Sequence, residues 1–189
     1  DVMIAADETL GELDARGLPK LSMTLDSCAR LGLNVAFDKP LWRCGDYVFY
    51  HALAASDARR FWLIEYDVAI NFADPLDFLR MIDARAREDF LCCCLEVAEK
   101  DWFWRKCVQR RFPVAYHAVF PLVRLSAEAA RRLLARRRVE TERLRLEHGD
   151  PDDWPNDEGF VASAAHEFGL PMADFNAYGA FYTRETFAP

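Results

Sequence analysis

Apolar runs with the spacing of strands and of helices alternate along the chain, with polar breaks between them. The clearest run is residues 61–70 (FWLIEYDVAI), which is apolar on both faces, as a central strand of a covered parallel sheet is. The same kind of pattern predicts further strands, at residues 2–6, 33–37, 89–96, 116–125 and 172–176. These runs are enough for a buried sheet.

Helical spacing marks the segments between these strands. Stripes of apolar residues predict helices at residues 22–30, 41–55 and 157–168. Two more helices are predicted to start at Asp74-Pro75 and at Ser126, because these residue types cap helix N-termini. The alternation favours an α/β fold, a three-layer sandwich with a mainly parallel central sheet. In such sheets ligands bind at the carboxyl ends of the strands.

Composition is that of a globular chain, with 52% hydrophobic and 13% aromatic residues among 189. No apolar run approaches the ~20 residues that span a bilayer, so no transmembrane segment is expected. The chain begins without an initiator Met and without the basic leader of a signal peptide, and we expect further residues upstream of Asp1.

The formal net charge of −7 argues against a nucleic-acid partner and against a general attraction to anionic lipid. Residues 131–145 are an exception, being strongly basic. A helix there could make a peripheral membrane contact through residues 131–138, or it could be a solvated surface helix.

The cysteines indicate the compartment and not a metal site. Three of the six are adjacent, which fits no zinc spacing, and we interpret all of them as buried apolar residues in a reducing, cytoplasmic compartment. In a strand, Cys92 and Cys94 would share a face and Cys93 would point the other way. The chain also lacks the GxGxxG, P-loop and GxSxG motifs of nucleotide-binding and hydrolase folds.

Two acidic residues lie toward the carboxyl end of the clearest strand. Glu65 and Asp67 are two residues apart, so in a strand they would share a face at about 6–7 Å. A divalent cation would offset their repulsion, since Mg²⁺ and Mn²⁺ favour one or two carboxylates together with substrate phosphates. The alternatives are an ion pair with an arginine, such as Arg43 or Arg60, or two acids in water.

Residues 62–68 (WLIEYDV) resemble the strand that carries the acidic DxD motif of GT-A type glycosyltransferases. The resemblance implies a nucleotide-diphospho-sugar transferase fold, with Mn²⁺ or Mg²⁺ on Glu65 and Asp67. It also implies a nucleotide-sugar donor and, as acceptor, a glycan or another hydroxyl compound. The first acid departs from DxD, and in some inverting members with a degenerate motif basic side chains hold the diphosphate without metal.

Other segments share this resemblance. Residues 1–7 look like an early strand of the nucleotide-binding half, and Asp7 at its end is assigned to the nucleotide donor. Residues 42–47 (WRCGDY) lie where such enzymes contact the nucleotide, which implies donor contacts from Arg43 and Asp46, and Tyr66 is assigned to the same role. The resemblance implies one domain over residues 1–189, in which the usual first βα unit is not evident.

Residues 155–160 (PNDEGF) resemble a helix start in branching N-acetylglucosaminyltransferase-like enzymes, in which an acid serves as catalytic base. The resemblance gives that role to Asp157 or Glu158, with inversion at the anomeric carbon. Asp157 continues the apolar stripe of its helix, so it is predicted to face inward with a raised pKa. Acids in a first helical turn also favour the helix dipole, which needs no function.

Residues 102–106 (WFWRK) follow a predicted strand and lie in a predicted loop. Aromatic side chains with a polar edge stack well on sugars, so this segment is a candidate acceptor-binding loop. The alternative is an aromatic anchor that closes the core.

Two other functions are consistent with the pattern. A non-catalytic GT-A-like domain would bind a nucleotide or glycan without turning it over. A metal-dependent phosphoesterase would also use clustered acids, and it predicts hydrolysis of simple phosphate esters without a sugar acceptor.

Overall fold

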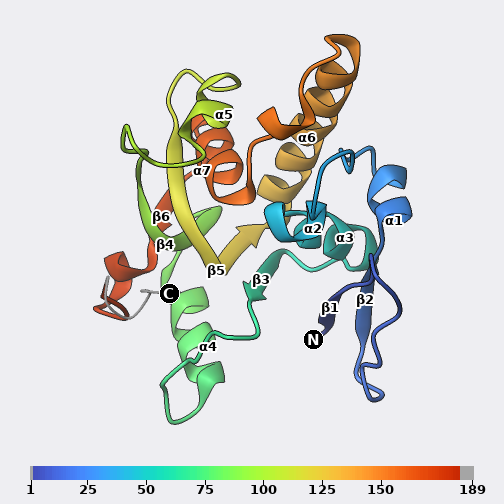
Figure 1. Ribbon diagram of the computed structural model, residues 1–189. Helices are drawn as coiled ribbons and strands as arrows, with labels where there is room; N and C mark the ends of the chain where they lie inside the picture. The colour runs from blue at the N-terminus through green and yellow to red at the C-terminus, as the bar shows by residue number, and fades with distance from the viewer. Residues whose placement is uncertain (1, 184–189) are drawn as a thin grey trace.

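The computed structural model describes residues 2–183, which form a mixed α/β fold (Figure 1). In these residues two strands come first and three helices follow, and strands then alternate with helices except that two helices precede the last strand. The strands are β1 (Ile4–Asp7), β2 (Lys20–Met23), β3 (Arg60–Ile64), β4 (Phe90–Val97), β5 (Tyr116–Ser126) and β6 (Met172–Asp174). The α-helices are α1 (Leu25–Arg30), α2 (Pro40–Arg43), α3 (Tyr47–Ala55), α4 (Pro75–Arg85), α5 (Arg105–Gln109), α6 (Ala127–Leu146) and α7 (Asp157–Glu167). Two 3₁₀ turns, η1 (Pro151–Asp153) and η2 (Phe175–Tyr178), complete the described chain.

The main sheet has four strands in the order β3-β5-β4-β6. The long strand β5 runs antiparallel to both of its neighbours, and only β4 and β6 are parallel. The α/β class is therefore confirmed, but the expectation of a mainly parallel central sheet is not. Periodicity reports which residues are buried, whereas strand direction depends on pairing partners far away in the sequence.

The strand that leads into the acidic pair lies at the edge of the main sheet, and the prediction that it is central is wrong. Helices nevertheless cover both of its faces, which explains its apolar pattern. Phe61 and Leu63 pack into the core under α3 and α6, whereas Trp62 packs with Phe78 of α4 on the other face. The strand also ends at Ile64, before the two acids.

The N-terminal region forms a separate parallel pair, β1 with β2. The helix predicted from residue 22 starts later, because Thr24 and Ser27 form a reciprocal capping box that fixes the N-terminus of α1. The strand predicted at residues 33–37 is not formed. Helix α3 packs against both β2 and β3 and so connects the pair to the main sheet.

Helix caps decide where most helices begin. Asp74 accepts a hydrogen bond from the Leu76 amide at the start of α4, and Ser126 accepts one from the Ala129 amide at the start of α6. Both predicted starts are confirmed. The single helix predicted over residues 41–55 is instead two helices, α2 and α3, separated at residues 44–46. There Asp157 of α7 binds the Gly45 amide, and Arg137 of α6 binds the Asp46 side chain.

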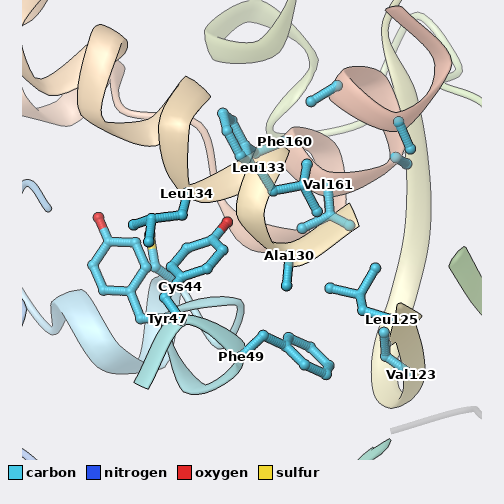
Figure 2. Packing of buried hydrophobic residues seen from close by; sticks show 14 of the residues in the cluster. Cys44, Tyr47, Phe49, Val123, Leu125, Ala130, Leu133, Leu134, Phe160 and Val161 are labelled. Carbon is cyan, nitrogen blue, oxygen red and sulfur yellow. The ribbon is translucent and has the colours of Figure 1, made fainter. Parts of the chain in front are cut away.

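Two apolar cores lie on the two faces of the main sheet. The larger core joins β5 to α3, α6 and α7, and Figure 2 shows Leu133, Leu134, Phe160 and Val161 packed over Tyr47 and Phe49. The smaller core lies under α4 and is built around Phe78, Ile82, Leu91, Cys93, Leu122 and Phe175.

The cysteine run illustrates the two-sided sheet. Cys92 belongs to the larger core and Cys93 to the smaller one, as strand alternation predicts. Cys94 packs against the smaller core as well, and not on the face of Cys92, because its φ is +52° and the register of β4 against β5 shifts there. Cys28, Cys44, Cys92 and Cys93 are buried, as expected, whereas Cys94 and Cys107 are only partly buried. None of the six forms a disulfide.

No helix in the described part of the chain is both long enough and apolar enough to cross a membrane.

Candidate functional site

The acidic pair lies in an exposed turn that continues β3. The Glu65 amide still donates to the Pro121 carbonyl of β5 at 2.8 Å, and the Val68 amide then donates back to the Glu65 carbonyl at 3.1 Å. Glu65, Tyr66 and Asp67 are all exposed, and the Tyr66 side chain is 101% accessible. The protein around the Glu65 carboxylate partly desolvates it, which raises its pKa, and the negative charge of Asp67 raises the pKa further. The two carboxylates are thus electrostatic neighbours, in a turn and not on one face of a strand.

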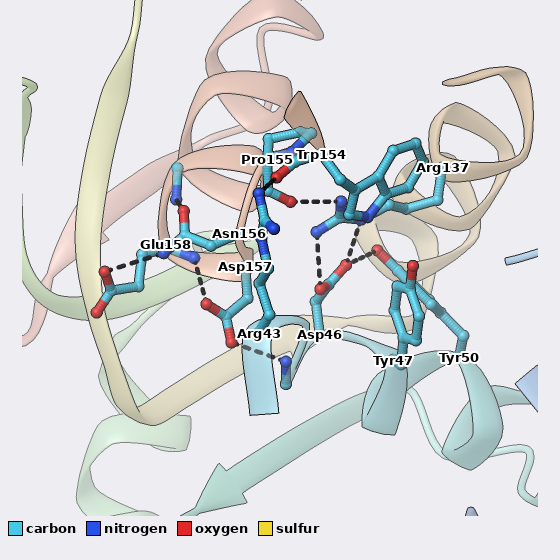
Figure 3. Close-up of polar contacts among 12 residues, drawn as sticks. Arg43, Asp46, Tyr47, Tyr50, Arg137, Trp154, Pro155, Asn156, Asp157 and Glu158 are labelled. Carbon is cyan, nitrogen blue, oxygen red and sulfur yellow. Dashed lines mark hydrogen bonds and ion pairs between the residues drawn. The ribbon is translucent and has the colours of Figure 1, made fainter. Parts of the chain in front are cut away.

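The second acidic pair occupies the first turn of α7 (Figure 3). Asn156 caps the helix through its side-chain oxygen, which accepts from the Gly159 amide at 3.2 Å. The Nδ2 atom of Asn156 also donates to the Glu158 carboxylate at 3.2 Å. One asparagine therefore sets both the start of the helix and the position of the Glu158 carboxylate.

Asp157 faces inward, as predicted, and is 7% exposed. Its Oδ2 accepts from the Gly45 amide and its Oδ1 from the Glu158 amide, both at 2.7 Å. A methyl group on Gly45 would come within 2.8 Å of Oδ2, so only glycine permits this approach without displacement. Burial raises the pKa of Asp157 well above its usual value, with further contributions from the charges of Asp46 and Glu158.

Glu158 connects the two acidic pairs. Burial raises its pKa to about 7, the hydrogen bond from Asn156 opposes the rise, and the negative charge of Glu65 adds to it. The charge on one carboxylate thus acts on the other, although they lie more than ninety positions apart in the sequence. In Figure 3 the Glu158 carboxylate points away from the Asp46–Arg137 pair. A carboxyl group with a pKa near neutrality can both take and release a proton.

Asp46 lies in the core. It forms a two-pronged ion pair with Arg137 of α6, with both N–O distances at 2.9 Å, and neither side chain is exposed. Tyr50 donates its hydroxyl to Asp46 at 2.6 Å, and Arg137 also donates to the Pro155 carbonyl at 2.9 Å. The sequence assigns Asp46 to the nucleotide, but its position favours a structural role that joins α3, α6 and the segment before α7.

Arg43 is also buried, at 7% exposure. Its guanidinium donates to the Trp154 carbonyl and lies over two aromatic rings, 5.2 Å from the centroid of Phe37 and 4.5 Å from that of Trp104. The sequence assigns Arg43 to the donor diphosphate, whereas these contacts hold α2 against the segment that leads into α7.

Asp7 lies apart from the other candidates, at the exposed end of β1, where its carboxylate accepts from the amide and hydroxyl of Thr9. The structure brings the turn of Glu65 and Asp67 and the first turn of α7 to the same part of β5, because the Glu65 amide binds Pro121 and Gly45, the partner of Asp157, lies against Phe120. Arg43 and Asp46 are instead buried in the core next to the first turn of α7.

Sequence reasoning overlooked Arg137, because it treated the basic helix as a solvated or membrane-facing surface. A signal was present: Leu133, Arg137, Glu140 and Leu144 are spaced by four, three and four residues, which is one face of a helix, and all four are buried. It also overlooked Gly45 and Asn156, which position the two acids of α7.

Glu65 and Asp67 would supply two hard oxygen ligands to a Mg²⁺ or Mn²⁺ ion, which commonly takes one or two carboxylates from protein beside substrate phosphates. Within residues 2–183, no three His, Cys, Asp or Glu side chains gather closely enough to hold a metal ion by themselves.

No protein-family model, no curated protein and no solved structure matches this chain.

Proposed function

We propose that this chain is a glycosyltransferase domain that moves a sugar from a nucleotide-diphospho-sugar to an acceptor hydroxyl. The observation that carries the proposal is that both acidic pairs lie against the same part of β5. The Glu65 amide donates to the Pro121 carbonyl at 2.8 Å, and Gly45, whose amide binds Asp157, lies against the ring of Phe120. The negative charge of Glu65 also contributes to the raised pKa of Glu158. In a metal-dependent sugar transfer, acids have two roles, which two neighbouring pairs can divide between them. One pair holds the metal that neutralises the departing diphosphate, and the other deprotonates the acceptor.

In this proposal the exposed pair, Glu65 and Asp67, binds the donor. Glu65 and Asp67 would hold Mg²⁺ or Mn²⁺, and the metal would supply positive charge to the departing diphosphate. Tyr66 lies between them with its ring fully in solvent, so it is free to pack against the base or sugar of a donor. Arg43 and Asp46 support this region from behind and do not contact the donor directly.

Glu158 is the better candidate for the base. Both oxygens of Asp157 already accept backbone amide hydrogens, whereas the Glu158 carboxylate is held by a single side-chain amide, that of Asn156. Glu158 is also more accessible than Asp157. In this assignment Asp157 positions the first turn of α7, and Glu158 accepts the proton of the acceptor hydroxyl.

A thermal-shift series tests the donor site. UDP, GDP and ADP are added to the protein with and without Mn²⁺, and we expect one of them to raise the melting temperature more strongly with the metal. The Glu65→Gln/Asp67→Asn variant should lose the metal-dependent part of that shift. The exposed pair Glu12→Gln/Asp57→Asn removes the same charge elsewhere and should respond like the wild type.

Turnover tests the chemistry. With the nucleotide sugar of the base that binds, Glu158→Gln should lower kcat by about 10²–10⁴-fold and leave the nucleotide-induced shift unchanged. A protein that shows no metal-dependent shift with any nucleotide diphosphate would contradict the proposal.

A domain that binds a nucleotide or glycan without turnover is the second candidate. The engagement of both Asp157 oxygens by backbone amides favours it, because one acid of the pair is then structural. It predicts the same thermal shifts as the enzyme, but no transfer or hydrolysis of any nucleotide sugar that binds.

A further inference from the structure

A cleft of about 520 Å³ lies between residues 100–103 and the helix α5 with its C-cap, Arg110. Its charged lining consists of one acid, Asp101, and four basic side chains, those of Lys100, Arg105, Lys106 and Arg110. The whole chain carries a net charge of −7, so this is a local reversal of sign. A cleft that concentrates positive charge attracts anions to it.

The four basic side chains differ in how they are held. Arg110 forms an ion pair with Asp153, and Arg105 donates to the Ala98 carbonyl at 2.6 Å. Lys100 and Lys106 are exposed. The two arginines therefore help to fix the walls, whereas the two lysines present exposed ammonium groups at the cleft.

Aromatic residues place this cleft next to the candidate base. The ring of Trp102 stacks on His117 at 5.0 Å, and a methyl group on Gly159 would come within 2.8 Å of it. Trp102 thus packs against the residue that follows Glu158 in the first turn of α7. Trp104 is held from the other side by the guanidinium of Arg43.

Phe103 is exposed between these two anchored tryptophans. Its ring is 80% accessible and meets Trp104 edge-on, with 4.7 Å between ring centroids. An exposed aromatic ring in the same cleft as two exposed ammonium groups fits a ligand that has both an apolar C–H face and a negative charge. Phosphorylated and carboxylated sugars have both features.

We propose that this cleft binds an anionic sugar, with its phosphate or carboxylate at Lys100 and Lys106 and its ring on Phe103. Its role as the acceptor site depends on the proposed function, because only then does the neighbouring Glu158 act on an acceptor hydroxyl. Binding itself does not depend on that function. The donor nucleotide is assigned to the turn of Glu65 and Asp67, which leaves this cleft for the second substrate.

Isothermal titration without any donor tests this inference. The probes are glucose 6-phosphate, glucose, inorganic phosphate and UMP, and we expect glucose 6-phosphate to bind most tightly. Lys100→Gln/Lys106→Gln should weaken its binding at least tenfold, and Phe103→Ala should weaken it while keeping the charge. Arg59→Gln/Arg87→Gln removes two exposed charges outside the cleft and should bind like the wild type.

Three results would overturn the inference: glucose binding as tightly as its phosphate, UMP or inorganic phosphate binding more tightly than glucose 6-phosphate, or full affinity in the double lysine variant. The outcome is separable from that of the donor experiment. If glucose 6-phosphate binds as described and no nucleotide diphosphate does, the cleft is an anionic-sugar site and the transferase proposal fails.

Discussion

At the scale of single residues, the two acids that begin α7 differ in what surrounds them. Asp157 is enclosed and receives two backbone amides, whereas Glu158 is partly open and receives one side-chain amide. Burial raises the pKa of both. Because a raised carboxyl pKa makes the folded state hold a proton that the unfolded chain releases, each of these acids makes stability depend on pH.

For Glu158 this dependence has a defined window. The folded protein keeps the proton up to about pH 7, and the unfolded chain releases it near pH 4.5. The stabilising effect of the protonated group is therefore complete below pH 4.5 and is lost as pH rises toward 7. The loss is at most about 3 kcal/mol, and partial exposure of the side chain to water makes it smaller. Glu158→Gln should remove this part of the pH dependence.

Urea unfolding of both proteins at several values between pH 4.5 and 7.5 measures the effect. The free energy of unfolding of the variant, relative to the wild type, should increase with pH across this window. Glu12→Gln, at an exposed position, should follow the wild type. Parallel curves for wild type and Glu158→Gln would show that Glu158 has an ordinary pKa in the folded state.

At the scale of elements, one buried ion pair holds three segments together. Arg137 of α6 binds Asp46 at the start of α3 and the Pro155 carbonyl just before α7, and its guanidinium lies 3.6 Å from the ring centroid of Phe160. Pro155 is followed directly by Asn156, whose side chain positions the Glu158 carboxylate. The geometry of the candidate site therefore depends on a pair that lies in the core behind it.

Removing one partner leaves an uncompensated buried charge. Asp46→Asn and Arg137→Met should each lower the free energy of unfolding by about 3–5 kcal/mol, and the double variant should lose clearly less than the sum of the two. Guanidinium unfolding of the four proteins gives the coupling energy. Arg131→Met on the same helix breaks only an exposed pair with Glu128 and should cost about 1 kcal/mol or less. Additive losses for Asp46 and Arg137 would contradict the assignment.

The elements that the sequence predicted best are those decided by local chemistry. The caps at Asp74 and Ser126 depend on residues within one turn, and the structure confirms them. Helix α7 also forms where it is predicted, but residues 159–165 are all buried, so its burial is not confined to one stripe. The break between α2 and α3 could not be predicted in this way. It depends on the approach of Asp157 to Gly45 and of Arg137 to Asp46, more than ninety positions away.

The candidate site shows the same division. The inward orientation of Asp157 followed from helical spacing, and the structure confirms it. The prediction that Glu65 and Asp67 share one face of a strand was wrong, since β3 ends before them. An apolar strand pattern does not show where the last ladder hydrogen bond falls. Nor does it distinguish an edge strand covered by helices from a central one.

At the scale of the whole molecule, burial is uneven. Strand β5 pairs on both sides and is buried along most of its length, at Ala118, Phe120, Leu122, Val123, Arg124 and Leu125. The eight residues of β1 and β2 include only two buried ones, Ala6 and Met23. The apolar side chains of Val2, Leu10 and Leu18 around this pair are 60% exposed or more.

This contrast predicts that the N-terminal pair opens before the main sheet does. A two-stranded sheet of short strands is marginally stable, and regions with few buried contacts open at a lower free energy than the global one. In hydrogen–deuterium exchange followed by mass spectrometry, peptides from residues 2–23 should therefore exchange faster than peptides from residues 116–126. Peptides from α7 should resemble those of β5, because α7 packs directly on that strand. Equal protection of the two regions would mean that β1 and β2 unfold only together with the main sheet, which would make α3 a stronger connection than its contacts suggest.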